Sequence, residues 1–224
     1  MTGSFNIVSN NNISNWGYGI EVNGNSNIIT NNKFTGDKDS GSEGIVITKG
    51  SYNNLSYNTI KNNYFTGLWI FRGSNNTIYK NNFIENGVGL CIGVGLVVYG
   101  KLYDSGNNTI IQNNFLNNTK QTKVDYLPDF VNYWNNDEEG NYWSNYNGTD
   151  LENNVIGDSP YIINENNQDN YPLIEIIDFS SSSPTPLPGV ATFLTTLVVA
   201  LMVIIGAGLG IIVYFKKYRK EKLR

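Results

Sequence analysis

The stretch "NTIYKNNF" at residues 76–83 returns almost unchanged as "NTIIQNNF" at residues 108–115. Three more octets share the pattern Asn-x-apolar-x-x-Asn-x-apolar: "NIVSNNNI" at 6–13, "NIITNNKF" at 27–34 and "NNLSYNTI" at 53–60. Successive octets begin 21, 26, 23 and 32 residues apart. A repeat of this length, built from short strands and turns, is typical of a solenoid.

Two positions of the octet are always asparagine. Asparagine tolerates a positive φ, so we expect position six to form a corner of each coil. In coils stacked about 4.8 Å apart, equivalent Asn side chains can also bond to one another. Position one is Asn6, Asn27, Asn53, Asn76 and Asn108, and position six is Asn11, Asn32, Asn58, Asn81 and Asn113.

Two other positions are always apolar and are expected to face inward. They are Val8, Ile29, Leu55, Ile78 and Ile110 at position three, and Ile13, Phe34, Ile60, Phe83 and Phe115 at position eight. Between the octets run short strands that open with Gly, "GIEV" (19–22), "GIVI" (44–47), "GLWI" (67–70) and "GLCI" (89–92). One coil cannot bury its apolar face alone, whereas stacked coils can. We predict an all-β fold, a right-handed parallel β-helix of about five coils over residues 1–125.

The longer intervals between octets, of 26 and 32 residues, predict loops that protrude from the β-helix at residues 35–43 and about 93–107. Recognition on a solenoid usually lies on such loops or on one outer face. A catalytic β-helix needs carboxylates aligned on neighbouring coils. The residues aligned after the Ile or Leu of each Gly-led strand are Glu21, Val46, Trp69 and Cys91. They form no carboxylate column, so an enzyme is the alternative interpretation rather than the first, and no catalytic residue is assigned.

Composition excludes several classes of function. The chain has no His and one Cys, so neither a His-based triad nor an intrachain disulfide is available. The basic tail 216–224 holds six of the 15 Lys and Arg residues, which leaves nine against 18 Asp and Glu ahead of it. A net charge of about −9 on that part argues against nucleic acid as a partner.

Residues 190–215 predict a transmembrane helix. They are 26 residues without a formal charge, long enough as a helix to span a hydrocarbon core of about 30 Å. The basic tail 216–224 then stays in the cytoplasm and the β-helix lies outside, on the plasma membrane. A Ser- and Pro-rich segment at 174–189 is expected to be a stalk. Because no export signal precedes the first octet, we expect the chain to be truncated at its N-terminus.

Residues 126–173 are rich in aromatic side chains and have two interpretations. The first is a cap over the apolar end and strand edges of the last coil. The second is a platform on which sugar rings stack, formed by Trp134, Tyr142, Trp143 and Tyr146.

The same segment carries a family resemblance. "GNYWSNYNGTD" at 140–150, "IGDSPY" at 156–161 and "DNYPL" at 169–173 resemble the closing motifs of NosD-type β-helix proteins, and the Asn-rich coils resemble that family's repeats. The resemblance covers roughly residues 1–174. It implies a right-handed β-helix of the carbohydrate-binding and sugar-hydrolase type, and the stalk, helix and basic tail resemble archaeal cell-surface members.

The resemblance also implies metals. The family namesake serves copper-site maturation, but Cu(I) prefers thiolate, thioether or imidazole ligands, and outside the membrane segment only Cys91 and Met1 qualify. Many relatives carry an Asp-x-Asp-x-Asp-Gly run before Ile-Gly-Asp. The corresponding residues here, with the spacing of an oxygen-only Ca²⁺ site, are Asp150, Glu152, Asn154, the Ile156 carbonyl and Asp158. Because Glu152 and Val155 depart from the calcium pattern, a solvated acidic turn is the alternative.

These observations predict a membrane-anchored cell-surface β-helix protein with a structural, adhesive or carbohydrate-binding role. Its expected partners are the membrane, surface polysaccharide and other envelope proteins. The alternative is a polysaccharide-active enzyme, a lyase, hydrolase or epimerase, whose catalytic coils are missing or unrecognised. A copper-maturation accessory role is the least favoured. Copper is not expected as a cofactor, and Ca²⁺ is the one cofactor that the pattern suggests.

Overall fold

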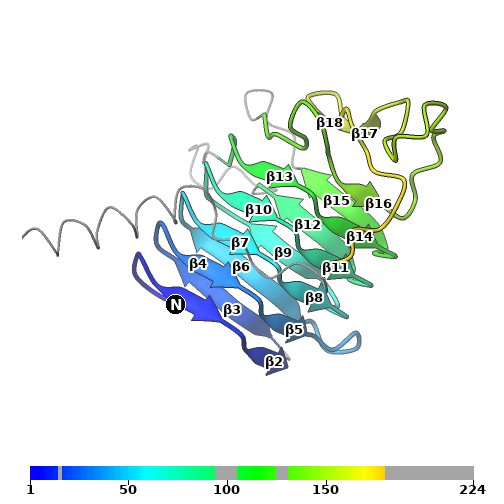
Figure 1. Cartoon of the computed structure of the whole chain (residues 1–224). Coiled ribbons are helices and arrows are strands. Elements are labelled where there is room, and N and C mark those ends of the chain that lie inside the picture. Colours follow the sequence, from blue (N-terminus) through cyan, green and yellow to red (C-terminus); the bar gives the residue numbers. More distant parts are fainter. Residues whose placement is uncertain (15–16, 94–104, 125–130, 180–224) are drawn as a thin grey trace, which may run out of the picture. The chain divides into compact units, whose positions relative to one another are not determined.

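The computed structural model describes residues 1–14, 17–93, 105–124 and 131–179. Met1–Phe179 forms one compact unit. Figure 1 shows this unit as a stack of short parallel strands that runs from the N-terminal coil to β17 and β18. The predicted transmembrane helix at 190–215, the tail at 216–224 and the stalk beyond residue 179 lie outside the described residues. Within the described part of the chain, no helix has the length and apolar character needed to span a bilayer.

Sixteen of the 18 described strands form three parallel sheets, one along each side of the solenoid, and β17 and β18 form a separate antiparallel pair. The first sheet contains β1 (Ile7–Ser9), β4 (Ile28–Thr30), β7 (Asn54–Ser56), β10 (Thr77–Tyr79) and β13 (Thr109–Ile111). The second contains β2 (Asn12–Ser14), β5 (Lys33–Thr35), β8 (Thr59–Lys61), β11 (Asn82–Ile84), β14 (Asn114–Leu116) and β16 (Tyr142–Trp143). The third contains β3 (Tyr18–Asn23), β6 (Glu43–Lys49), β9 (Thr66–Ile70), β12 (Val88–Ile92) and β15 (Lys120–Val124). The prediction of an all-β parallel solenoid of about five coils is confirmed.

The interior follows the register that the octets predict. Position three pairs Val8 with Ile29, Leu55, Ile78 and Ile110 through the first sheet. Position eight pairs Ile13 with Phe34, Ile60, Phe83 and Phe115 through the second. All of these side chains except those of Val8 and Ile13, on the first coil, are completely buried. The third sheet adds two apolar columns, one that ends in Leu90 and one that continues from Ile92 to Val124. Each coil therefore contributes a layer to one continuous apolar core.

Both asparagine columns form hydrogen-bonded ladders, as predicted. The position-one side chains donate from Nδ2 to Oδ1 of the next coil at 2.9–3.0 Å, from Asn6 to Asn132. The position-six side chains do the same at 3.0–3.1 Å, from Asn11 to Asn141. A third ladder, which the octet does not include, joins Asn63, Asn86 and Asn118 at 2.8–2.9 Å. The ladders satisfy the polar backbone at corners that water does not reach.

The prediction of a positive φ at position six was wrong. The left-handed residue is the one before it, and its side chain varies: Asn10, Asn31, Tyr57, Lys80 and Gln112, with φ between 53° and 59°. The residue before position one does the same, as Tyr52 and Asn75 show. The positive φ directs the side chain of the residue before position six outward. The side chain of the Asn at position six then points inward and joins its ladder. Geometry therefore selects Asn one residue after the bend, while the outward residue is free to differ.

Residues 131–173 continue the solenoid before leaving it. Strand β16 places Trp143 on Phe115, with ring centroids 4.4 Å apart, and Tyr161 stacks on the other face of Trp143 at 4.1 Å. Tyr161 belongs to the antiparallel pair β17 (Tyr161–Asn164) and β18 (Asn167–Asp169). The first two ladders end on β18, at Asn167 and Asp169.

Residues 174–179, predicted as the start of the stalk, pack against the solenoid. The Ile177 backbone exchanges two hydrogen bonds with the Asn114 side chain, at 2.9 and 3.0 Å. The Phe179 ring then lies edge-on to Tyr57, with centroids 6.2 Å apart. The chain thus turns back from the last coil toward an earlier one, crossing the corner between the first and second sheets.

Candidate functional site

Two of the four predicted platform residues lie in the core. Trp134 and Trp143 are each 1% exposed, and their indole N–H groups donate to Asn167 Oδ1 at 3.0 Å and to Asp169 Oδ2 at 2.9 Å. Trp143 has a ring stacked on each face, so neither face is open to a sugar. The structure therefore assigns both indoles to packing over the last coil rather than to a surface platform.

The two predicted tyrosines are half-buried and serve other contacts. Tyr142 precedes Trp143 in β16, so its side chain points to the opposite face of the sheet. The Tyr146 hydroxyl donates to the Ser159 carbonyl at 2.7 Å. Gly157 lies so close to this ring that a Cβ there would be 2.1 Å from the tyrosine hydroxyl oxygen. Tyr146 thus holds the loop between residues 148 and 159, and the four aromatic residues do not form one surface.

The predicted calcium loop is stabilised by its own backbone. The Asp150 carboxylate accepts hydrogen bonds from the N–H groups of Asn154 and Val155 at 3.1 and 3.0 Å. Asp158 Oδ2 accepts from Leu151 N and from the Thr149 hydroxyl, both at 2.9 Å. Glu152 accepts from the Asn154 amide at 3.2 Å, and the Ile156 N–H donates to Asn154 Oδ1 at 3.0 Å. Here the predicted carboxylate ligands act as turn acceptors.

Metal-ligating side chains do not gather elsewhere in the described part of the chain. Among residues 1–14, 17–93, 105–124 and 131–179, no three His, Cys, Asp or Glu side chains converge as a metal site would require. Cys91, the single cysteine of the chain, is buried on β12 between Trp69 and Lys123 of the neighbouring strands. Among the described residues, the soft donors that copper prefers are therefore one buried thiol and the thioether of Met1.

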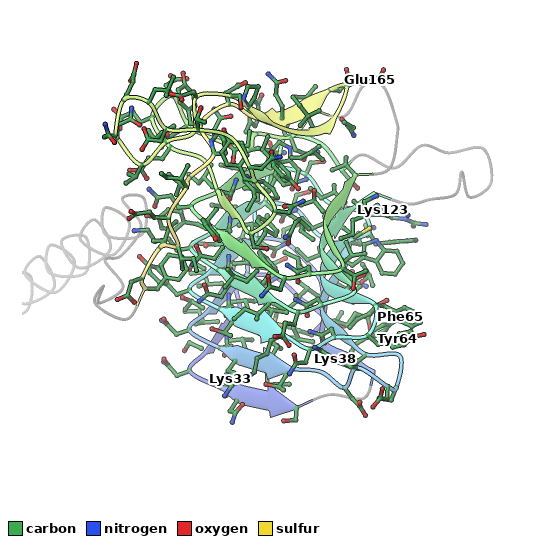
Figure 2. All side chains as sticks on the ribbon, turned by 90° about the vertical axis from the view of Figure 1, so that its right-hand side faces the viewer. Lys33, Lys38, Tyr64, Phe65, Lys123 and Glu165 are labelled. Atoms are coloured by element: carbon green, nitrogen blue, oxygen red, sulfur yellow. The ribbon has the colours of Figure 1, made fainter. Side chains whose placement is uncertain are left out.

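A groove at the corner between the second and third sheets carries a different set of residues. It has a volume of about 500 Å³ and is lined by Lys38, Asn63, Tyr64, Glu85, Asn86, Gly87, Asn117 and Thr119. Beside it, Tyr64 and Phe65 are 50% and 51% exposed, and their rings meet edge-on with centroids 4.7 Å apart. Figure 2 shows Lys38, Tyr64 and Phe65 along one edge of the solenoid, with Glu165 at its far end. We call this feature the aromatic groove.

The loop between β5 and β6, residues 36–42, supports the aromatic groove. Ser42 is completely buried, and its Oγ accepts the Tyr64 N–H at 3.1 Å, while its carbonyl accepts the Phe65 N–H at 3.0 Å. The same Oγ donates to the Asp37 carbonyl at 2.7 Å, which closes the loop on itself. The backbone under both rings is therefore fixed by the loop of the preceding coil.

An ion pair bridges the tip of this loop to a later coil. Lys38 Nζ lies 2.8 Å from Glu85 Oε2, and both side chains are about half exposed, at 53% and 48%. The hydrogen bond and charge of Lys38 hold the pKa of the Glu85 carboxyl below its usual value. The aromatic groove thus presents a cation, an anion, an amide and a hydroxyl beside two aromatic rings.

Sequence reasoning missed these residues because they occupy the positions that vary between copies. Asn63 and Asn86 are equivalent in the third ladder, and Thr66 pairs with Val88 in the next strand. Two residues, Tyr64 and Phe65, lie between Asn63 and the start of β9, whereas only Gly87 lies between Asn86 and the start of β12. This one-residue insertion is the sequence signal for the site, because the longer corner exposes the side chains of Tyr64 and Phe65.

A second groove contains two carboxylates. Glu139 and Glu175 line it with Lys80, Gln112, Val155 and three apolar residues of the closing segment, and its volume is about 350 Å³. The Gln112 amide donates to Glu139. The groove is therefore lined by two carboxylates and one ammonium group.

The family model described as "Periplasmic copper-binding protein (NosD)" matches residues 1–148, about two thirds of the chain. No match was found among curated proteins. The matched range contains the five octets, the third ladder and the aromatic groove, and the first two ladders as far as Asn132 and Asn141. The resemblance of the Asn-rich coils to this family is confirmed, and the chain belongs to the NosD family.

Proposed function

We propose that this chain is a saccharide-binding protein of the cell surface or periplasm, and that the aromatic groove is its binding site. The observation that carries the proposal is the half-exposed pair Tyr64 and Phe65, held beside a polar groove by a buried serine. Apolar ring surface that stays exposed to water is unfavourable, which makes a fixed, half-exposed aromatic pair a candidate for binding.

The chemistry of the groove suits a sugar ring. A pyranose has an apolar face of C–H groups, which packs on an aromatic ring, and a rim of hydroxyls that both donate and accept. The side chains of Asn117 and Thr119 offer both hydrogen-bonding roles at the groove wall. A small number of polar groups beside apolar surface is the usual composition of such a site.

The solenoid supplies a rigid support for this site. The ladders under the groove, at Asn63, Asn86 and Asn118, are buried and bonded from coil to coil. A preorganised site loses little conformational entropy when a ligand binds. The features around the groove therefore favour recognition over a purely structural role.

The remaining segments extend the proposal. The stack of Phe115, Trp143 and Tyr161 supports a capping role for residues 131–173, since it covers the apolar end of the last coil. The family is described as periplasmic, and the apolar residues 190–215 support a membrane anchor outside the described part. The family's copper description does not fit the donor set of this chain, so no copper role is proposed.

Loss of the aromatic pair tests the proposal. The full chain in detergent is screened against neutral, acidic and amino oligosaccharides, and the best ligand is titrated by calorimetry. We expect Tyr64→Ala combined with Phe65→Ala to weaken that ligand by at least about tenfold, because each lost stacking contact removes about 1 kcal/mol or more. Tyr18→Ala, at another exposed tyrosine, serves as the control. Absence of binding to every saccharide, or equal loss in the control, contradicts the proposal.

A second candidate function, a polysaccharide-cleaving enzyme, is favoured by one observation. Glu139 and Glu175 share a groove with Lys80, which provides two carboxylates and an ammonium for acid–base chemistry. We expect an enzyme of this kind to release shorter products from neutral or uronate polysaccharides. Glu139→Gln and Glu175→Gln would then each reduce product formation by about a hundredfold or more. Intact polymer after prolonged incubation with the wild-type chain would eliminate this candidate.

A further inference from the structure

The charged residues that line the aromatic groove are one of each sign. Among its described lining residues, Lys38 is the cation and Glu85 the anion, with Nζ and Oε2 2.8 Å apart. The two residues are 47 positions apart in the sequence and belong to different coils, and both side chains are about half exposed. A structural ion pair of this exposure contributes little to stability, generally below about 1 kcal/mol. Its position at the groove therefore invites a role in recognition.

A charged ligand gains little from such a pair. Because Nζ and Oε2 are only 2.8 Å apart, a carboxylate that approaches Lys38 is also repelled by Glu85, which offsets much of the attraction. An ammonium that approaches Glu85 meets Lys38 in the same way. The pair itself has no net charge, and the other polar residues at the groove wall, such as Asn117 and Thr119, are neutral. Lys61, whose charge also lowers the pKa of Glu85, is not among the residues that line the groove.

Two neighbouring hydroxyls match the pair. Lys38 Nζ has donors that the salt bridge does not use, and the Glu85 carboxylate has further acceptor sites. Hydroxyls on adjacent ring carbons stand at a hydrogen-bonding separation from each other, as Nζ and Oε2 do. One hydroxyl can accept from Lys38 while its neighbour donates to Glu85, and hydrogen bonds to charged groups are the stronger ones.

We propose that the aromatic groove takes an uncharged saccharide, which places two vicinal hydroxyls on Lys38 and Glu85 and an apolar ring face on Tyr64 and Phe65. The inference rests on the proposed saccharide-binding function and names its ligand class. The lowered pKa of Glu85 supports it, because the carboxylate stays ionised, and so remains an acceptor, in mild acid.

Three probes of equal length test the ligand class by calorimetry on the full chain: a neutral oligosaccharide, an oligouronate and an oligomer of an amino sugar. We expect the neutral probe to bind at least about tenfold more tightly than either charged probe, a difference typical of losing one charged hydrogen bond. Its affinity should change little between low and high salt, because no net charge is neutralised. Tighter binding of the oligouronate would overturn the inference and leave the saccharide-binding function standing, whereas no binding of any probe would remove both.

Variants of the ion pair locate the effect. We expect Lys38→Gln and Glu85→Gln each to weaken the neutral probe by about tenfold. The exposed residues Lys33 and Glu165, changed to Gln, serve as charge-matched controls and should leave the affinity unchanged. The double exchange of Lys38→Glu with Glu85→Lys restores an ion pair and should recover most of the affinity, which also shows that the loop is still folded. Unchanged affinity in both single Gln variants would overturn the inference.

Discussion

Replacing Asn81 by alanine is expected to lower the free energy of unfolding by about 3–5 kcal/mol, because its amide is completely buried and fully used. Its Oδ1 accepts from the Asn58 backbone and side-chain amides at 2.9 and 3.0 Å. Its Nδ2 donates to the Leu55 carbonyl at 2.8 Å and to Asn113 Oδ1 at 3.0 Å. Alanine leaves these groups buried without a partner. Urea denaturation of the full chain in detergent, followed by tryptophan fluorescence, measures the change.

Asn12→Ala is the matched control for this prediction. Asn12 lies on β2 of the first coil, and its side chain is exposed. The same chemical change should there alter the free energy of unfolding by less than about 0.5 kcal/mol. A comparable loss in both variants would mean that asparagine acts through local backbone preference and not through the ladder.

Acidification is expected to stabilise the fold through Asp169. This side chain ends the second ladder, is completely buried, and accepts hydrogen bonds on Oδ2 from Asn141 N at 2.7 Å and Trp143 Nε1 at 2.9 Å. Burial raises the pKa of the carboxyl to about 6, against an ordinary 3.8, although the donated hydrogen bonds oppose the rise. The folded state therefore binds the proton more tightly than the unfolded chain. This contribution to stability is fully present below about pH 4 and is lost as the pH rises through 6.

The size of the effect follows from the two pKa values. The rise from 3.8 to about 6 corresponds to about 3 kcal/mol, at about 1.4 kcal/mol for each tenfold change in proton affinity. Asp169→Asn cannot titrate. We expect the free energy of unfolding of this variant, relative to the wild type, to increase by up to about 3 kcal/mol between pH 4 and 7. A difference that stays constant with pH would contradict the prediction.

The scaffold could be predicted because its rules repeat in every coil. Position three and position eight are apolar in all five octets, and they occupy the core columns that the spacing predicts. The left-handed corner was misplaced by one residue. Asparagine both tolerates a positive φ and forms ladders, and the sequence alone does not separate these two uses. Tyr57, Lys80 and Gln112 show which one applies, because their corners bend without asparagine.

The candidate site was harder to predict because it depends on differences between copies. Trp134 and Trp143 have the composition of a sugar platform, and they lie beyond the last full octet, so the repeat pattern did not assign their side chains to the core. The aromatic groove joins Lys38, Tyr64 and Glu85 from three separate turns. Only the fold brings them together, and the one-residue insertion at Tyr64 and Phe65 gains meaning once the third ladder is known.

The return path of residues 174–179 has a mechanical consequence. The last described residue, Phe179, lies beside Tyr57 and not beside the last coil. A pull on the chain beyond this point would peel the segment away, loading the Tyr57 contact first and the Asn114–Ile177 bonds next. Such contacts break one at a time under low force, whereas the ladders share load across many bonds. Residues 174–179 are therefore expected to detach and extend under tension before the coils and the aromatic groove are deformed.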